Sequence, residues 1–243
     1  MFTIKKHIPN FVTSLNVTCG VLGITQAFAG NLQTAFIFML GAALADYLDG
    51  FTARMLSVVS PMGKELDSLC DMVSFGVLPG MMLFKLMAAC GGPDGILGYA
   101  PLLIPIFSAL RLAKFNIDPR QGENFIGLAT PACAMICASV CQIVITSPGS
   151  GIETLCSTAW FIPVLSAVLS LLLVCELPMF SMKIKKGAAK SITAERAVFF
   201  AAAAVAIVIT AILRLNWAAA VLMIFSAYIL ENLAAWPFQN KNK

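Results

Sequence analysis

Long apolar segments follow one another along most of the chain, and short polar breaks separate them. A helix needs about 20 apolar residues to cross the hydrocarbon core of a bilayer. The pattern predicts an all-α integral membrane protein with about eight transmembrane helices. The apolar windows cover residues 11–29, 32–54, 66–90, 98–116, 130–147, 159–177, 197–213 and 217–236. Because they leave no room for a separate soluble domain, we expect residues 1–243 to form one membrane-embedded unit.

The composition agrees with a membrane location. Of the 243 residues, 59% are hydrophobic and only 12% are charged, against roughly 25% charged residues in a typical soluble domain. This composition excludes a water-soluble globular protein. The formal net charge is +4, which is too small to indicate nucleic acid as the main partner.

Lysine and arginine are distributed unevenly between the two sides of the predicted spans. With eight crossings and both termini inside, 14 of the 16 basic residues fall on the inner side, and Lys85 and Arg214 are the exceptions. Basic residues accumulate in cytoplasmic loops, so this asymmetry predicts cytoplasmic termini. The alternative is a secretory signal with a cleavage site at residues 27–29. Polar residues from Asn10 onward interrupt its apolar run, and cleavage would leave an odd number of spans.

The eight cysteines show no C-x-x-C spacing. Cys133, Cys137 and Cys141 repeat every four residues on one helical face, which leaves a thiolate metal site as an alternative. No histidine lies near them in the sequence. We therefore expect these cysteines to be small packing residues within apolar helices.

Four aspartates lie within or beside predicted spans. Asp46 and Asp49 are three residues apart in the second window, and Asp67 and Asp71 are four apart at the start of the third. These spacings place each pair on one face of a helix. Because the intervening loop is short, we expect antiparallel neighbouring helices whose acidic faces meet near their cytoplasmic ends. Ionisable residues inside spans indicate a functional site.

Converging carboxylates repel one another and must take up protons or bind cations. Ligands that are all oxygen favour Mg²⁺ or Mn²⁺. Gly50 and Ala53 leave the helix surface bare for a bulky ligand, and Arg54 adds a cation suited to a phosphate. Close helix packing also explains the small residues, and an ion-conducting or proton-relay cluster is the alternative for the acids. The combination favours a site for metal and phosphate.

The same residues form a sequence signature. Residues 46–54 read DYLDGFTAR and residues 63–71 read GKELDSLCD. They resemble the signature D-x-x-D-G-x-x-A-R followed by G-x-x-x-D-x-x-x-D of the CDP-alcohol phosphatidyltransferases, and every signature position is filled. Ala129 and Gly80 depart from the residues usual in the most similar branch, the membrane-spanning phosphatidylserine synthases. The segments that are similar to this branch are residues 66–77, 111–116, 125–128 and 178–181.

The resemblance implies a helical catalytic core at about residues 10–190, and the apolar windows beyond it predict additional C-terminal helices at about 197–236. It also implies two divalent metal ions, Mg²⁺ or Mn²⁺. Asp46 and Asp67 would then bridge both ions, Asp49 would hold one, and Asp71 would hold the other. Asp71 would in addition be the catalytic general base.

The resemblance further implies which residues contact the CDP-lipid. Gly50, Arg54 and Ser60 match contact positions, and Ala53 and Gly63 match positions that leave clearance for the cytidine end. These five positions surround the aspartates in the sequence, so one site would hold both the metal ions and the nucleotide.

Several weaker assignments concern the rest of the site. Asn10 and Thr13 resemble a segment near the nucleotide, although a helix start with a back-bonded Thr13 hydroxyl explains them equally. Arg111 and Asn116 are candidates for a serine pocket because a guanidinium pairs with a carboxylate, whereas the alternative for Arg111 is the positive-inside pattern alone. Ser74, one turn beyond Asp71, either faces the acceptor or packs.

The activity implied by the resemblance is the transfer of a phosphatidyl group from CDP-diacylglycerol to L-serine, with release of CMP. Alternatives are the same transfer to glycerol phosphate, inositol phosphate or choline, and a cation transporter that uses the aspartates as its pathway. The implied surroundings are membrane lipids in a bacterial or archaeal cytoplasmic membrane, with the active site on the cytoplasmic side and a homodimer as the assembly.

Overall fold

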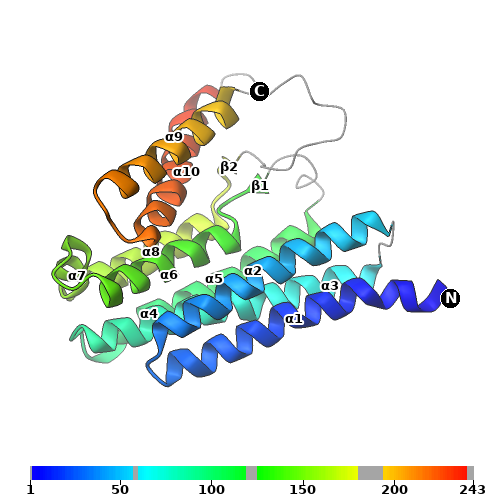
Figure 1. Cartoon of the computed structure of the whole chain (residues 1–243), viewed down its shortest axis with the longest axis horizontal. Helices are drawn as coiled ribbons and strands as arrows, with labels where there is room; N and C mark the ends of the chain where they lie inside the picture. Colours follow the sequence, from blue (N-terminus) through cyan, green and yellow to red (C-terminus); the bar gives the residue numbers. More distant parts are fainter. Residues whose placement is uncertain (1, 57–59, 119–124, 180–193, 240–243) are drawn as a thin grey trace.

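The fold is described from a computed structural model, which covers residues 2–56, 60–118, 125–179 and 194–239. The predicted all-α architecture is confirmed, because each of the eight apolar windows coincides, apart from a few end residues, with a helix or a run of helices (Figure 1). The first two windows form α1 (Phe2–Phe28) and α2 (Leu32–Met55), joined by a tight turn at Gly30, whose φ is +84°. Glycine adopts this left-handed conformation without strain.

The third and fourth windows are composite. The third comprises α3 (Pro61–Asp71), the π-helical turn η1 (Met72–Val77) and α4 (Leu78–Ala89), which follow one another without a break. The fourth comprises a 3₁₀ segment η2 (Gly95–Leu102) and α5 (Leu103–Ile117). The remaining helices are α6 (Thr130–Thr146), the short α7 (Gly151–Cys156), α8 (Phe161–Val174), α9 (Ala194–Ile212) and α10 (Trp217–Gln239).

Five of these helical segments are long and apolar enough to cross a membrane. They are Pro9–Phe28, Leu32–Leu56, Pro61–Ala89, Gly95–Ile117 and Trp217–Ala234. The apolar helices in the other three windows, Thr130–Thr146, Phe161–Val174 and Val198–Ile212, are shorter. The chain is therefore an all-α protein with several membrane-spanning helices, and eight crossings remain a prediction.

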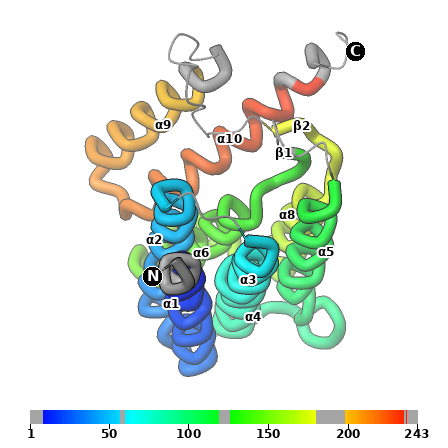
Figure 2. The backbone as a smooth tube through the Cα atoms, turned by 90° about the vertical axis from the view of Figure 1, so that its right-hand side faces the viewer, coloured from blue at the N-terminus to red at the C-terminus, as the bar shows by residue number. Residues whose placement is uncertain are grey.

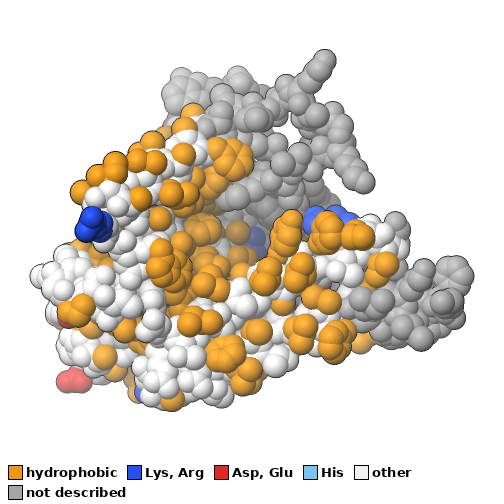
Figure 3. All heavy atoms as spheres, viewed as in Figure 1, with side chains coloured by type: hydrophobic (Ala, Val, Ile, Leu, Met, Phe, Trp, Pro, Cys, Tyr) orange, Lys and Arg blue, Asp and Glu red, His pale blue; other side chains and the backbone are white. Residues whose placement is uncertain are grey.

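Helices α1 and α2 and the continuous segment from α3 to α4 run along the long axis of the molecule (Figures 1 and 2). α1 packs along α2 and also contacts α3, η1 and α4. α6 packs on α4, α5 packs on α8, and α10 packs on α6 and carries α9 on its other side. Many large apolar side chains remain exposed, including Ile37 on α2 and Ile212 on α9, and Figure 3 shows apolar side chains scattered over the described part of the face in view. Such a surface suits a lipid environment.

The centre of the fold lies around α6. Cys133, Cys137 and Cys141 are fully buried there and belong to the main apolar core. The expectation that these cysteines pack inside apolar helices is confirmed. Their positions on one face of α6 place small side chains where neighbouring helices come close.

Two short strands were not expected from the sequence. β1 (Phe125–Ile126) and β2 (Pro178–Met179) pair antiparallel, with Phe125 opposite Met179. Gly127 follows β1 with φ of +76°, and its N–H donates to the carbonyl of Leu177 at 2.9 Å. The pair thus links the segment before α6 to the segment after α8, which are distant in the sequence.

Candidate active site

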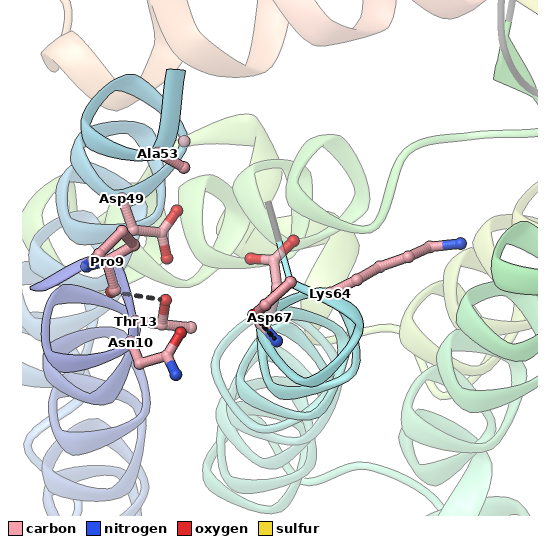
Figure 4. Close-up of a pocket in the computed structure, with 10 residues that line it drawn as sticks. Pro9, Asn10, Thr13, Asp49, Ala53, Lys64 and Asp67 are labelled. Atoms are coloured by element: carbon pink, nitrogen blue, oxygen red, sulfur yellow. Dashed lines mark hydrogen bonds between the residues drawn. The ribbon is translucent and has the colours of Figure 1, made fainter. Parts of the chain in front are cut away.

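Three of the four predicted metal-binding aspartates meet at one end of the bundle. Asp46 and Asp49 of α2 and Asp67 of α3 each present a carboxylate oxygen, and these oxygens lie within 4.8 Å of one another. In Figure 4 the carboxylates of Asp49 and Asp67 face each other across the gap between the two helices. The prediction that the acidic faces of the second and third windows meet is therefore confirmed.

The cluster fits a divalent cation. Asp49 is only 6% exposed, and its Oδ2 is buried without a hydrogen-bond partner. A buried carboxylate oxygen with no partner is costly unless a proton or a cation satisfies it. Because all three contributing side chains are carboxylates, the donor set suits a hard ion such as Mg²⁺ or Mn²⁺.

Helix α1 packs on both α2 and α3, the two helices that flank the gap. The sequence predicted that α2 and α3 are direct antiparallel neighbours, and their directions are indeed opposite (Figure 1). However, α3 packs chiefly on α1 and η1, and α1 in turn packs along α2. Small residues on α2, Gly50 and Ala53, leave the space between α2 and α3 open. The two helices are therefore separated by a pocket and do not pack directly on each other there.

Asp71, the fourth predicted ligand, lies outside the three-carboxylate set. Its Oδ1 accepts a hydrogen bond of 3.2 Å from Nδ2 of Asn16, a fully buried residue of α1. The charge of Asp71 still interacts with those of Asp46 and Asp67. Asp71 is one turn further along α3 than Asp67, so it lies deeper in the bundle, next to the cluster.

The π-helical turn explains where Ser74 lies. The sequence placed Ser74 on one stripe with Asp67 and Asp71 by assuming 3.6 residues per turn, whereas the π-helix η1 begins at Met72 and changes that spacing. The hydroxyl of Ser74 donates to the backbone carbonyl of Asn16 at 3.1 Å and is fully buried against α1. The geometry corresponds to the packing alternative, not to an acceptor contact.

A pocket of about 230 Å³ opens beside the carboxylates. Six of the seven residues predicted to contact the CDP-lipid line it, namely Asn10, Thr13, Gly50, Ala53, Ser60 and Gly63. The seventh, Arg54, is exposed, and its Nη2 lies 4.0 Å from the place where a Cβ at Gly50 would stand. The pocket therefore combines carboxylates with a surface of α2 that lacks large side chains, and the guanidinium of Arg54 lies nearby.

The start of α3 shapes the pocket wall. Ser60 is the N-cap, its Oγ accepts the N–H of Gly63 at 3.0 Å, and Pro61 occupies the first helical turn. Such a cap satisfies an N–H group that has no partner within the helix. A Cβ at position 63 would lie 3.0 Å from the Ser60 hydroxyl oxygen and 3.3 Å from Oδ1 of Asn10. The missing side chain of Gly63 thus allows α1 and α3 to meet closely at this wall.

A family model for CDP-alcohol phosphatidyltransferase matches residues 6–172, which is more than half of the chain. The chain belongs to the CDP-alcohol phosphatidyltransferase family. The matched region holds the three-carboxylate set, Asp71 and all residues that line the pocket.

Several curated proteins are similar to this member of the family. A CDP-diacylglycerol–serine O-phosphatidyltransferase of Bacillus subtilis is 38% identical over 130 residues, which are 54% of this chain and 72% of the relative. An enzyme of the same name from Mycobacterium leprae is 34% identical over 182 residues, or 72% of this chain and 58% of the relative. An archaetidylserine synthase of Methanothermobacter thermautotrophicus is 35% identical over 54% of this chain and 56% of its own length.

Thr13 shows features of both alternatives that the sequence left open, a back-bonded hydroxyl and a place beside the predicted nucleotide site. Its hydroxyl donates to the carbonyl of Pro9 at 3.0 Å, as expected for a back-bonded threonine (Figure 4). The helix does not start there, however, because α1 begins at Phe2 and runs through Pro9. Thr13 also lines the pocket beside Asp49. A back-bonded hydroxyl keeps the methyl group and oxygen of Thr13 in a fixed position at the pocket wall.

Arg111 of α5 is a buried residue. It is 7% exposed, Nη1 donates to the hydroxyl of Thr130 at 2.8 Å, and the guanidinium lies 5.6 Å from the ring centre of Phe115. Its Nε is buried without a hydrogen-bond partner. An arginine that only follows the positive-inside pattern would extend into water or headgroups. Arg111 is instead enclosed within the fold, where it bonds to Thr130.

Asn116 has a different environment from the predicted serine pocket. Its Nδ2 donates to Oγ of Ser68 at 3.0 Å, and its backbone carbonyl accepts a hydrogen bond of 3.0 Å from Nζ of Lys64. These bonds join the end of α5 to α3. The side chain of Asn116 is therefore occupied in holding two helices together.

Two functional candidates were missed in the sequence. Asn16 holds Asp71, and the available signal was a polar residue in the middle of the first apolar window. Lys64 lines the pocket, and Figure 4 shows its side chain extending away from Asp67. The feature of the sequence that could have identified Lys64 is a basic residue within the acidic signature.

Proposed function

We propose that this chain transfers the phosphatidyl group of CDP-diacylglycerol to the hydroxyl group of L-serine, with release of CMP. The observation that carries the proposal is the cluster of Asp46, Asp49 and Asp67 beside a pocket lined by the family signature. The names of the relatives from Bacillus subtilis and Mycobacterium leprae support serine as the acceptor.

The proposal includes two divalent ions, Mg²⁺ or Mn²⁺, held by Asp46, Asp49 and Asp67 together with Asp71. Bound divalent ions offset the charge of a diphosphate and stabilise a departing phosphate. The three converging carboxylates would supply ligands to these ions, and a cation would satisfy the buried Oδ2 of Asp49, which has no hydrogen-bond partner.

The pocket residues bind and orient the donor. Gly50 and Ala53 present a bare surface of α2 against which the cytidine end can pack. Asn10 and Ser60, which also line the pocket, offer polar atoms. Arg54 supplies a fixed positive charge suited to a phosphate. Because the nucleotide is water-soluble and the acyl chains are not, the site must lie where the spans meet water, which we place at the cytoplasmic side together with both termini.

Arg111 binds the acceptor, and Asp71 activates it. The Nε of Arg111 is buried without a hydrogen-bond partner, and such a guanidinium is a good partner for the carboxylate of a free amino acid. Asp71, oriented by Asn16, receives the proton of the serine hydroxyl as that oxygen bonds to the lipid-linked phosphorus. The bond from this phosphorus to the CMP oxygen breaks at the same time, so no covalent enzyme intermediate is required.

The direct test is CMP release by the purified chain in detergent micelles that contain CDP-diacylglycerol and Mn²⁺. L-Serine should increase CMP release at least tenfold and yield phosphatidylserine, whereas glycerol phosphate, inositol phosphate and choline should not. CMP release that follows one of these other alcohols would overturn the choice of acceptor. Cation flux into liposomes without nucleotide, lost in Asp49→Asn, would instead support the transporter alternative.

A further inference from the structure

Helix α3 carries Asp67 but has little apolar packing of its own. Only Cys70 is buried among its 11 residues, and Met62 and Leu69 are exposed. Among the described elements, only α1 and the continuing turn η1 pack extensively on α3. A segment with few buried apolar contacts moves easily, so polar contacts on its remaining faces have a large share in fixing its position.

Asn116, in the last turn of α5, makes such contacts with α3. In Figure 2, α3 stands between α1 and α5. Nδ2 of Asn116 donates to Oγ of Ser68 at 3.0 Å and to Oε2 of Glu65 at 3.4 Å. Its backbone carbonyl, which has no partner within the last turn of a helix, accepts a hydrogen bond of 3.0 Å from Nζ of Lys64. Asn116 thus bonds to three residues on one face of α3.

The bond between Asn116 and Ser68 is the one best able to hold α3. Lys64 and Glu65 are exposed, and polar contacts in water contribute little, whereas the bond to Ser68 is partly buried. Ser68 directly follows Asp67, and successive residues of a helix point about 100° apart. Asp67 therefore faces α2 while Ser68 faces α5, and a bond that holds Ser68 also fixes the backbone of Asp67.

A divalent ion is sensitive to small shifts of α3. The carboxylate oxygens of Asp46, Asp49 and Asp67 lie within 4.8 Å of one another, and Mg²⁺ requires oxygen ligands at about 2.0–2.1 Å in a nearly ideal octahedron. Asp67 comes from a different helix than the other two, and a pocket separates the two helices. Shared coordination therefore depends on how far α3 stands from α2, and a displacement of about 1 Å weakens such a site.

We propose that Asn116 is a positioning residue of the metal site: its bond with Ser68 holds α3 where Asp67 can share a divalent ion with Asp46 and Asp49. This assignment rests on the proposed function, of which the metal site is a part. It gives Asn116 a role in metal affinity instead of the serine contact predicted from the sequence.

The test measures Mn²⁺ binding by the purified full chain, from the electron paramagnetic resonance signal of free Mn²⁺. Loss of a residue that bonds directly to a metal ligand lowers metal affinity 10- to 100-fold, and Asn116 acts one step further out, so Asn116→Ala should raise the dissociation constant of Mn²⁺ about fivefold. The KM for L-serine at saturating Mn²⁺ should stay within twofold of wild type.

Lys114→Gln is the matched control. Lys114 lies near Asn116 on α5, but its Nζ bonds to Oε1 of Glu176 at 3.0 Å and not to α3. Its dissociation constant for Mn²⁺ should stay within twofold of wild type. A fivefold rise in this variant as well would mean that any damage to the end of α5 weakens metal binding, and the specific role of Asn116 would be wrong.

A double-mutant cycle tests whether Asn116 acts through Ser68. Ser68→Ala removes the same bond from the other side, so it should raise the dissociation constant of Mn²⁺ by a similar factor, and it provides the measurement if Asn116→Ala does not fold. The double variant should exceed either single variant by less than twofold. Multiplied effects, or unchanged Mn²⁺ binding in the single variants, would overturn the assignment, and a raised serine KM with unchanged Mn²⁺ binding would favour the serine pocket.

The proposed function and this assignment fail in different ways. If Asn116→Ala weakens Mn²⁺ binding but the wild-type chain shows no CMP release that depends on serine, the acceptor is wrong and the role of Asn116 is supported. If the wild-type chain releases CMP in response to serine but Asn116→Ala binds Mn²⁺ as tightly as wild type, only the role of Asn116 is wrong. If the wild-type chain binds no Mn²⁺, the metal site fails and this assignment fails with it.

Discussion

Asn16 of α1 donates from Nδ2 to Oδ1 of Asp71 over 3.2 Å, at a position where Asn16 is fully buried. The first helix thereby orients the carboxylate that we propose as the general base. Hydrogen bonds to charged groups contribute about 1.5–3 kcal/mol, so Asn16→Ala should lower kcat about 10- to 100-fold. The KM for CDP-diacylglycerol should change little, because Asn16 does not line the nucleotide pocket.

The matched control for this prediction is Asn31→Ala, since Asn31 lies in the exposed turn between α1 and α2, where its Nδ2 donates to Oε1 of Gln26. Its kcat should stay within twofold of wild type. A similar kcat for Asn16→Ala and the wild-type chain would mean that Asp71 needs no orientation by α1.

Asp67 contributes a carboxylate from α3 to the three-carboxylate set. Asp67→Asn keeps the shape of the side chain and removes its charge, so we expect CMP release to fall at least 100-fold. Asp94→Asn is the control, because Asp94 is exposed in the loop before η2. Initial rates at saturating Mn²⁺ check this prediction, and an Asp67→Asn variant with more than a tenth of the wild-type rate would contradict it.

Gly63 lies where the Ser60 cap and Asn10 approach each other. An added Cβ would stand 3.0 Å from the Ser60 hydroxyl oxygen, so Gly63→Ala should push the pocket wall outward and raise the KM for CDP-diacylglycerol about fivefold. The serine KM should remain near its wild-type value. Gly151→Ala is the control because no atom lies within 4 Å of its added Cβ. Equal KM values for both variants would show that this wall does not contact the donor.

Gly127 should be a determinant of stability rather than chemistry. Its φ is +76°, and an added Cβ would stand 2.7 Å from the carbonyl oxygen of Leu173. A strained backbone costs about 1–3 kcal/mol, and the collision adds to that cost. Gly149 has a similar φ of +80° but open space around it. In thermal unfolding in detergent, Gly127→Ala should lower Tm clearly more than Gly149→Ala, and equal shifts would contradict the role assigned to the close contact.

The apolar pattern predicted the helices well because burial in a membrane imposes one simple requirement, a long apolar helix. The proximity of Asp46, Asp49 and Asp67 also followed from helical periodicity and from the short loop between their helices. Periodicity failed at Ser74, since the π-helical turn from Met72 changes the residue spacing. It also could not reveal contacts such as Asn16 with Asp71 or Arg111 with Thr130, which depend on how distant helices pack.

The most direct test of the central claim is a Mn²⁺ titration of the purified chain, monitored by electron paramagnetic resonance. The central claim is that the carboxylates of α2 and α3 form a shared divalent-metal site. Two Mn²⁺ ions should bind per chain with spectral signs of coupling between them, and Asp46→Asn should remove that coupling. Binding of no Mn²⁺ by the wild-type chain, or binding unchanged in Asp46→Asn, would contradict the account.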